Sequence, residues 1–204
     1  MGVLRGPEPA LIETLQLWSS EAATSASILL RPWLLTVLGH AEFLLGRNHD
    51  AGATLEMAVT EAERLDLAQF ECHARALLAC VRARLCEPEA AANLGHALEL
   101  ARGRGDPWSE IIVLRGLAEL KPSRSAISLL EQACNLARRV ELRPELARSL
   151  LALGLAKRRG KIAGADATLA EAVKLYTEMQ MREDFFETED PAGNIVRDRI
   201  AATV

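Results

Sequence analysis

The sequence has few aromatic residues and no long apolar run. Aromatic residues make up 4% of its 204 positions, so the core must come from aliphatic and alanine side chains, a composition typical of helices. No run approaches the roughly 18 apolar residues that a membrane-spanning helix needs. The opening residues also lack the apolar stretch of a signal peptide. We therefore expect a cytoplasmic protein with no membrane partner.

An excess of basic residues is missing as well. The formal net charge at pH 7 is -4, from 24 Lys and Arg against 28 Asp and Glu, whereas nucleic-acid-binding domains usually carry a basic surface. Residues 157–161 form one basic cluster, which is little for a phosphate-binding surface in an acidic chain. We therefore expect no nucleic-acid partner.

The motifs of common enzyme classes are absent too. The sequence contains no phosphate-binding loop, no serine nucleophile elbow, no HExxH zinc motif and no dinucleotide-binding glycine motif. Cys72, His73, Cys80 and Cys86 come nearest to a metal site, but they lack the CxxC-type spacing of structural zinc. Buried cysteines commonly pack as small hydrophobic residues, and sensitivity to oxidation is the alternative. We expect no catalytic residue, no metal and no cofactor.

An internal repeat is the main positive feature of the sequence. Four segments each contain an alanine, an aliphatic residue four positions later and an alanine three positions after that. The triplets are Ala51/Leu55/Ala58, Ala90/Leu94/Ala97, Ala126/Leu130/Ala133 and Ala165/Leu169/Ala172. Their first members are 39, 36 and 39 residues apart. Such regular spacing indicates a repeat architecture.

Each triplet predicts one face of a helix, because residues at i, i+4 and i+7 lie on the same side of a helix. Two alanines on that face let a neighbouring helix approach closely. A second apolar helix is predicted before each triplet, at residues 34–45, 72–85, 108–120 and 146–158. The repeat unit is therefore a helix hairpin.

Capping residues agree with these helices. Asp106-Pro107 places a capping carboxylate before a proline at the first helical position. Gly46 lies where the first helix of a pair should end. Asp50 and Ser125 are the predicted caps of the second helices in their hairpins.

The repeats divide the chain into three parts. We predict an N-terminal helical cap at residues 1–30, a repeat domain at residues 31–182, and an acidic tail or capping helix at residues 183–204. The predicted repeats within the domain are residues 33–68, 70–105, 107–142 and 144–181.

Charge is distributed unevenly between the repeats and the tail. Residues 183–190 carry five acids and no base, whereas residues 102–161 carry 13 bases and 6 acids. One interpretation is a solvated, disordered tail. The other is that the tail folds onto a basic groove, in its own chain or in a neighbour's, which gives autoinhibition or self-association.

The small–large–small pattern on paired helices resembles the tetratricopeptide repeat (TPR) across about residues 30–182. The glycine in the first helix of that family has a counterpart only at Gly39, and the units here exceed the usual repeat of about 34 residues. This longer form is similar to the repeat regions of bacterial LuxR/MalT-like regulators and nucleotide cyclases. The resemblance implies an all-α, right-handed α-solenoid of about four helix hairpins, with N- and C-terminal capping helices.

The resemblance also implies which side chains line the concave face, because the first helix of each TPR pair faces inward. The predicted partner-binding residues are Trp33, His40, Phe43, Arg75, Arg82, Trp108, Arg115, Lys157 and Arg158. Gly154 falls in the same register. Arg75, Arg82 and Arg115 are expected to project to one side, and arginine suits an acidic or carboxylate-bearing peptide. The alternative is that these are ordinary solvated helix charges and that the tryptophans fill gaps between repeats.

These features predict a non-catalytic protein–protein interaction scaffold that holds a peptide or partner segment in a partly basic groove. The alternative is the ligand- or partner-sensing region of a transcriptional regulator or cyclase-type signalling protein. The resemblance to bacterial regulators implies a role in regulation for both. A pocket closed at one end favours a small ligand, and a long open trough favours a peptide.

Overall fold

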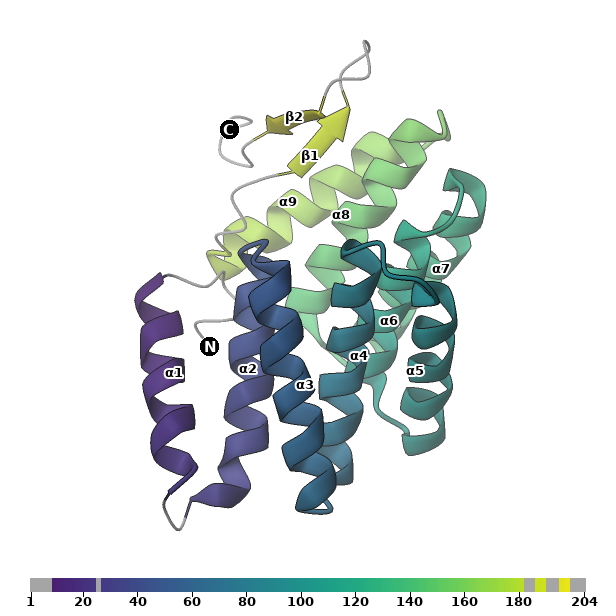
Figure 1. Cartoon of the computed structure of the whole chain (residues 1–204). Helices are drawn as coiled ribbons and strands as arrows, with labels where there is room; N and C mark the ends of the chain where they lie inside the picture. Colours follow the sequence, from purple (N-terminus) through teal and green to yellow (C-terminus); the bar gives the residue numbers. More distant parts are fainter. Residues whose placement is uncertain (1–8, 25–26, 182–185, 190–194, 199–204) are drawn as a thin grey trace.

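The computed structural model describes residues 9–24, 27–181, 186–189 and 195–198, and within them nine α-helices follow one another (Figure 1). The helices are α1 Pro9–Ala22, the 3-10 helix η2 Ile28–Leu30, α2 Arg31–Leu44, α3 Asn48–Arg64, α4 Ala68–Arg84, α5 Ala90–Arg104, α6 Pro107–Glu119, α7 Ser123–Arg139, α8 Arg143–Arg159 and α9 Ala165–Met179. The predicted helical fold is confirmed, and each predicted repeat helix is present with bounds shifted by a few residues. None of these described helices combines the length and apolar character needed to cross a membrane.

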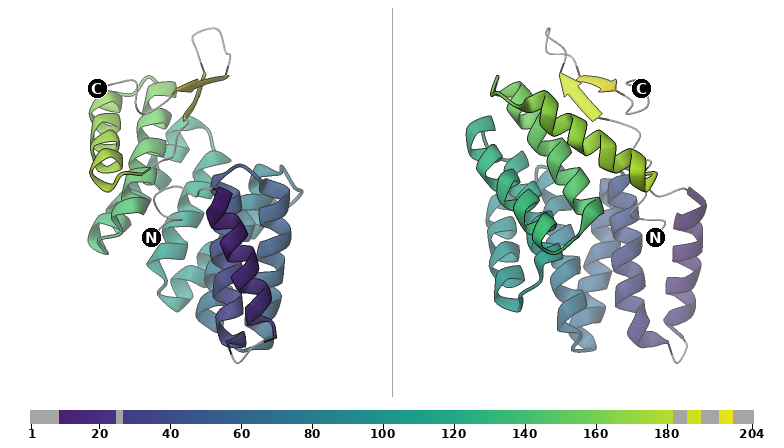
Figure 2. Two further views of the ribbon diagram at one scale, coloured as in Figure 1. Left: turned by 90° about the vertical axis from the view of Figure 1, so that its left-hand side faces the viewer. Right: turned by 180° about the vertical axis from the view of Figure 1, so that it is seen from behind.

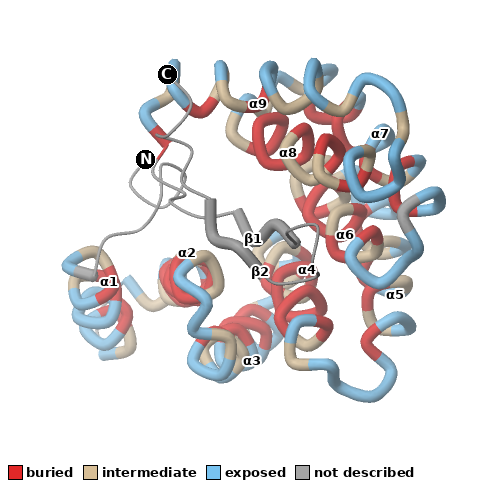
Figure 3. The backbone as a smooth tube through the Cα atoms, turned by 90° about the horizontal axis from the view of Figure 1, so that it is seen from above, coloured by how far each residue is buried: buried red, intermediate tan, exposed pale blue. Residues whose placement is uncertain are grey.

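Neighbouring helices form two layers. α2, α4, α6 and α8 pack side by side in that order, and each also contacts the odd-numbered helix on either side of it in the sequence. Seen from above, these four helices line the inside of an arc, while α3, α5 and α7 lie outside it (Figure 3). Figure 2 shows α1 at one end of this row and α8 with α9 at the other. The inner layer thus brings side chains from distant parts of the sequence toward one region.

The alanine–aliphatic–alanine triplets supply the contact between the layers. Ala51, Leu55 and Ala58 on α3 are fully buried, and the triplets of α5 and α7 are buried as well. On α9 only Ala172 of its triplet is buried, because α8 is the one described helix that packs extensively against α9. The repeat detected in the sequence is therefore a repeat of helix–helix contacts.

Gly39 permits a close approach between α2 and α3. A Cβ atom at Gly39 would lie 2.6 Å from Cγ of Leu55, a fully buried side chain. We expect Gly39→Ala to lower the free energy of unfolding by about 1–3 kcal/mol because the helices must separate, as measured by urea denaturation. Gly95→Ala on α5 is the matched control: nothing lies within 4 Å of its Cβ position, so helix propensity should raise stability by about 0.5–1 kcal/mol. Equal effects at both positions would contradict this account of Gly39.

The helix ends agree with the capping predictions in part. The side chain of Asp106 accepts two backbone N–H groups of the first turn of α6, both at 3.1 Å, as predicted. Gly46, two residues after the last residue of α2, has a φ of 74°. The predicted caps Asp50 and Ser125 are wrong, because α3 and α7 begin two residues earlier and these residues lie inside the helices.

Two short strands come after the helices in the sequence. β1 Phe186–Glu189 pairs antiparallel with β2 Ile195–Asp198, with Phe186 opposite Asp198. The predicted C-terminal capping helix is therefore wrong for residues 195–198, where the β-branched pair Ile-Val favours an extended backbone. The rest of the predicted acidic tail, residues 182–185, 190–194 and 199–204, lies outside the described residues.

Candidate functional site

The inner layer carries a group of buried and partly buried polar side chains that come from four helices. This inner polar cluster consists of His40 on α2, His73 on α4, Ser109 and Arg115 on α6, and Glu145 and Arg148 on α8. Charged residues are almost never fully buried unless they are paired. Their position on the inner layer therefore marks this cluster as the candidate site.

Glu145 is the centre of the charged part of the cluster. Its side chain is 1% exposed, and its two carboxylate oxygens accept from different arginines. Nη1 of Arg115 donates to Oε2 at 2.5 Å, and Nη1 of Arg148 donates to Oε1 at 2.8 Å. Arg148 lies one turn further along α8, whereas Arg115 reaches across from α6. Glu145 thereby fixes the positions of both guanidinium groups.

The arginines keep Glu145 ionised. Burial by itself raises the pKa of the Glu145 carboxyl, but Arg115 and Arg148 outweigh burial and hold the pKa well below its usual range. One carboxylate thus faces two guanidinium cations, so the three side chains together carry one positive charge. Such a site favours ligands that are rich in hydrogen-bond acceptors.

The two histidines of the cluster are kept neutral by burial. Burial lowers the pKa of His40 to about 3 and also lowers the pKa of His73. Nδ1 of His73 lies 3.1 Å from Oγ of Ser109, and that hydroxyl donates to Oδ2 of Asp106 at 2.5 Å. Because the hydroxyl proton is used for Asp106, we assign the donated proton of His73 to Nδ1. Nε2 of His73 is then an acceptor.

Two buried polar atoms beside the cluster have no hydrogen-bond partner in the described part of the chain. They are Nε1 of Trp108 and Oγ of Ser149. The ring centroid of Trp108 lies 4.5 Å from that of His73, and Ser149 is fully buried one turn after Glu145. Leaving a buried polar group without a hydrogen bond costs about 1–3 kcal/mol. Both groups can donate a hydrogen bond.

The structure brings some of the predicted site residues into this region. His40 and Arg115 belong to the inner polar cluster, and Trp108 packs against His73. Trp33, at the start of α2, is 47% exposed. Phe43 is partly buried against the hydrophobic core.

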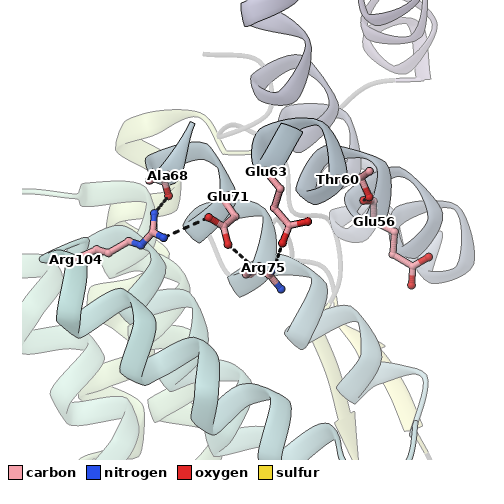
Figure 4. Close-up of polar contacts among 7 residues, drawn as sticks. All are labelled: Glu56, Thr60, Glu63, Ala68, Glu71, Arg75 and Arg104. Carbon is pink, nitrogen blue, oxygen red and sulfur yellow. Dashed lines mark hydrogen bonds and ion pairs between the residues drawn. The ribbon is translucent and has the colours of Figure 1, made fainter. Parts of the chain in front are cut away.

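Arg75 takes part in an ion-pair network of surface side chains (Figure 4). Its guanidinium donates to Glu63 of α3 and to Glu71 of α4. Glu71 also accepts from Arg104 of α5, whose guanidinium donates in addition to the carbonyl of Ala68. The network links three consecutive helices, α3 to α5, through charges that are already paired.

Arg75, Arg82 and Arg115, which we predicted to project to one side, pair with acids on different helices. Arg82 donates to Glu56 of α3 at 2.9 Å, so Arg75 and Arg82 both face α3, whereas Arg115 faces α8. The two α4 arginines lie seven residues apart and share a helix face, but this face is not the one that carries His73. Lys157 and Arg158 likewise lie near acids of α7 and α9.

The predicted register fails on α8 because of the turn before α9. A Cβ atom at Gly154 would lie 2.6 Å from Cδ2 of Leu169, so Gly154 faces α9 and not the groove. Gly39 precedes its contact Leu55 by 16 positions, but Gly154 precedes Leu169 by 15. A difference of one residue turns a helix face by about 100°.

One signal in the sequence could have identified the α8 part of the cluster. Glu145 and Arg148 are three residues apart, so they share a helix face, and apolar residues follow them at Leu150, Leu151 and Leu153. A close charged pair at the start of an apolar helix is a candidate buried ion pair. His73 offered no comparable signal, because its partner Ser109 is 36 residues away.

A cavity of about 530 Å³ lies between the start of α4 and the turn from α5 to α6. Its lining includes Cys72, Arg104 and Asp106. Arg104 is already paired with Glu71, and Asp106 caps α6. Burial raises the pKa of the Cys72 thiol, which disfavours the reactive thiolate. Among the described residues, no group of three or more His, Cys, Asp or Glu side chains is placed to hold a metal ion.

No protein-family model matches the chain, and no curated protein matches its sequence. The function is therefore inferred from the inner polar cluster and its neighbours.

Proposed function

We propose that this chain is a non-catalytic protein-interaction scaffold, built as a right-handed TPR-like α-solenoid of four helix hairpins. In this proposal the protein works in the cytoplasm, in bacterial regulation, and holds a peptide or partner segment on its inner layer. The ordered packing of α2, α4, α6 and α8 supports the repeat architecture. Helical arrays of this kind present extended concave surfaces to their partners.

The observation that carries the proposal is the pair of unpartnered donors beside the inner polar cluster. Nε1 of Trp108 and Oγ of Ser149 are buried on the inner helices without acceptors in the described part of the chain. A structural core would place apolar groups there, because each unmade hydrogen bond is costly. The unpaired state of these two donors among the described residues is explained if a partner supplies the acceptors.

The same groups define the chemistry of the partner. Backbone carbonyls and carboxylates of a peptide are acceptors, and Arg115 and Arg148 add positive charge. Arg75 and Arg82 do not contribute to this preference, because acids of α3 and α4 already pair with them. We therefore propose a peptide segment with an acidic residue or a free carboxylate at the cluster.

The second candidate function is a sensing region that binds a small molecule, as in a transcriptional regulator or a cyclase-type protein. The burial of the cluster favours it: Glu145 is 1% exposed and His40 is 5% exposed. Convergent polar groups in an enclosed site suit a small, acceptor-rich ligand. The two functions share the same residues and differ in what binds to them.

A pull-down tests the proposed function. The bait would be the wild-type chain or the double variant Trp108→Phe/Ser149→Ala, with a lysate of the native cells. We expect the wild-type partner to be reduced about tenfold or more by the double variant, since a lost hydrogen bond to a buried group costs about 1–3 kcal/mol. Neither substitution breaks a hydrogen bond among the described residues, and circular dichroism checks that the smaller ring at position 108, which packs on the core, leaves the helices intact.

Ser128→Ala, on an exposed position of α7, is the matched serine control and should leave capture unchanged. Capture of the same partners by the double variant would contradict a role for these donors. If no protein is captured, the sensing function is tested by measuring thermal unfolding with and without acidic metabolites. Stabilisation of the wild type but not of the double variant would support it.

A further inference from the structure

An apolar surface lies at the end of the row formed by α1, η2 and the start of α2. Exposed large hydrophobic side chains are few among the described residues, and five of the eight lie between residues 17 and 33. These five form what we call the terminal apolar surface, and each is 47% to 56% exposed. They are Leu17, Trp18, Leu29, Leu30 and Trp33.

The two segments that carry this surface lie close to each other at the end of α1. The end of α1 and the start of α2 lie side by side (Figure 1), and Nε of Arg31 donates to the carbonyl of Ser19 at 3.3 Å. α1 packs on α2 through Ile12 and Leu15. Leu17 is two residues from Leu15, so it points to the opposite side of α1. The exposed face of α1 is therefore an unpartnered face within the described chain.

The size of the terminal apolar surface indicates that it binds a partner. The exposed apolar area of the five side chains is on the order of 500 Å², comparable to the largest apolar patch on a typical monomer, which is often functional. Two of the five are tryptophans, the residue type most enriched in binding hot spots. Single exposed leucines need no explanation, but this group at one end of the row does.

Charge identifies the kind of occupant. α1 contains Glu13 and Glu21 and no basic residue. These acids are four residues before and after Leu17, so all three lie along one stripe of the helix. Neither glutamate has an ion pair within the described residues, whereas Glu119 and Glu171, also exposed, are each paired with an arginine. The apolar stripe is thus bordered by negative charge that no basic residue among the described ones pairs with.

We propose that the terminal apolar surface binds an amphipathic helix of a partner protein, with aliphatic residues against Leu17 and Trp18 and lysine or arginine opposite Glu13 and Glu21. A second copy of this chain fits less well, because a symmetric contact would bring the acidic stripes of two α1 helices together. The surface is separate from the inner polar cluster, so this proposal stands or falls independently of the proposed function.

A designed peptide tests the proposal on the full chain. The probe is a fluorescein-labelled helix as long as α1, 14 residues, with leucines along one face and lysines on the other. Its counterpart carries glutamates in place of the lysines. We expect the Leu/Lys peptide to bind at least about tenfold more tightly than the Leu/Glu peptide by fluorescence anisotropy. Unlabelled peptide should shift the tryptophan emission to shorter wavelength as Trp18 and Trp33 leave water.

Variants separate the apolar contribution from the charge. Leu17→Ser/Trp18→Ser should weaken binding about tenfold or more, and Met57→Ser, an exposed side chain on α3, should change nothing. Glu13→Lys/Glu21→Lys should reverse the preference toward the Leu/Glu peptide. All are exposed positions, so circular dichroism should stay unchanged. Binding that ignores these substitutions would overturn the proposal, as would a dimer that Leu17→Ser/Trp18→Ser dissociates.

Discussion

Replacing Glu145 by glutamine is expected to lower the free energy of unfolding by about 3–5 kcal/mol, since removing one partner of a buried ion pair leaves uncompensated charge. Glu145 accepts from both Arg115 and Arg148, so Glu145→Gln leaves two like charges close together on the inner layer. Urea denaturation near pH 7 measures the effect.

An exposed ion pair provides the control for this prediction. Glu171 pairs with Arg138 at 2.8 Å, but both side chains are nearly half exposed, and surface pairs contribute less than about 1 kcal/mol. Glu171→Gln should therefore leave the urea midpoint almost unchanged. A small loss in both variants would mean that Glu145 does not hold the two arginines as the structure indicates.

Stability is also expected to fall as the pH drops below about 6.5, before most carboxylates take up protons. Burial lowers the pKa of His40 from 6.5 to about 3 in the folded chain. Between these pH values the unfolded chain binds a proton that the folded chain excludes. The contribution of His40 to the free energy of unfolding is therefore complete above pH 6.5. Below pH 6.5 this contribution declines by up to about 1.4 kcal/mol per pH unit. Burial lowers the pKa of His73 too, with the same sign.

Urea denaturation from about pH 7 to about pH 5 gives the slope of the free energy of unfolding against pH, which is compared between wild type and His40→Gln. The comparison is needed because burial raises the pKa of Glu42, which acts in the opposite sense on the wild type. We expect the slope of His40→Gln to be shallower by up to about 1.4 kcal/mol per unit. His96→Gln, exposed on α5, should keep the wild-type slope. An unchanged slope in His40→Gln would show that His40 is accessible to protons in the folded chain.

The helices could be predicted from the sequence because their signal is local. Residues such as Ala51 and Leu55 repeat at helical spacing, and each hairpin buries its own triplet, so neighbours in the sequence decide the pattern. Asp106 could be identified for the same reason, since a cap acts within one helical turn. The strand at residues 195–198 was missed because a turn sequence before a short segment says little about helix or strand.

The inner surface could be predicted only in part because its signal is not local. His40 and Arg115 were identified, but the rotation of each helix about its axis depends on the length of the turn beside it. The spacing between Gly154 and its contact Leu169 is one residue shorter than the spacing between Gly39 and Leu55. The register predicted from α2 therefore does not hold on α8. The partners of Arg75 and Arg82 lie on α3, and a charged residue on a predicted helix does not reveal its partner in another helix.

The most direct test of the central claim, that the inner layer binds the partner, is amide hydrogen exchange on the complex with the captured partner. We expect exchange to slow in α6 and α8, which carry Trp108, Arg115, Glu145 and Ser149, more than in the outer helices α5 and α7. Slower exchange confined to α3, α5 and α7 would place the partner on the outer layer and contradict the claim.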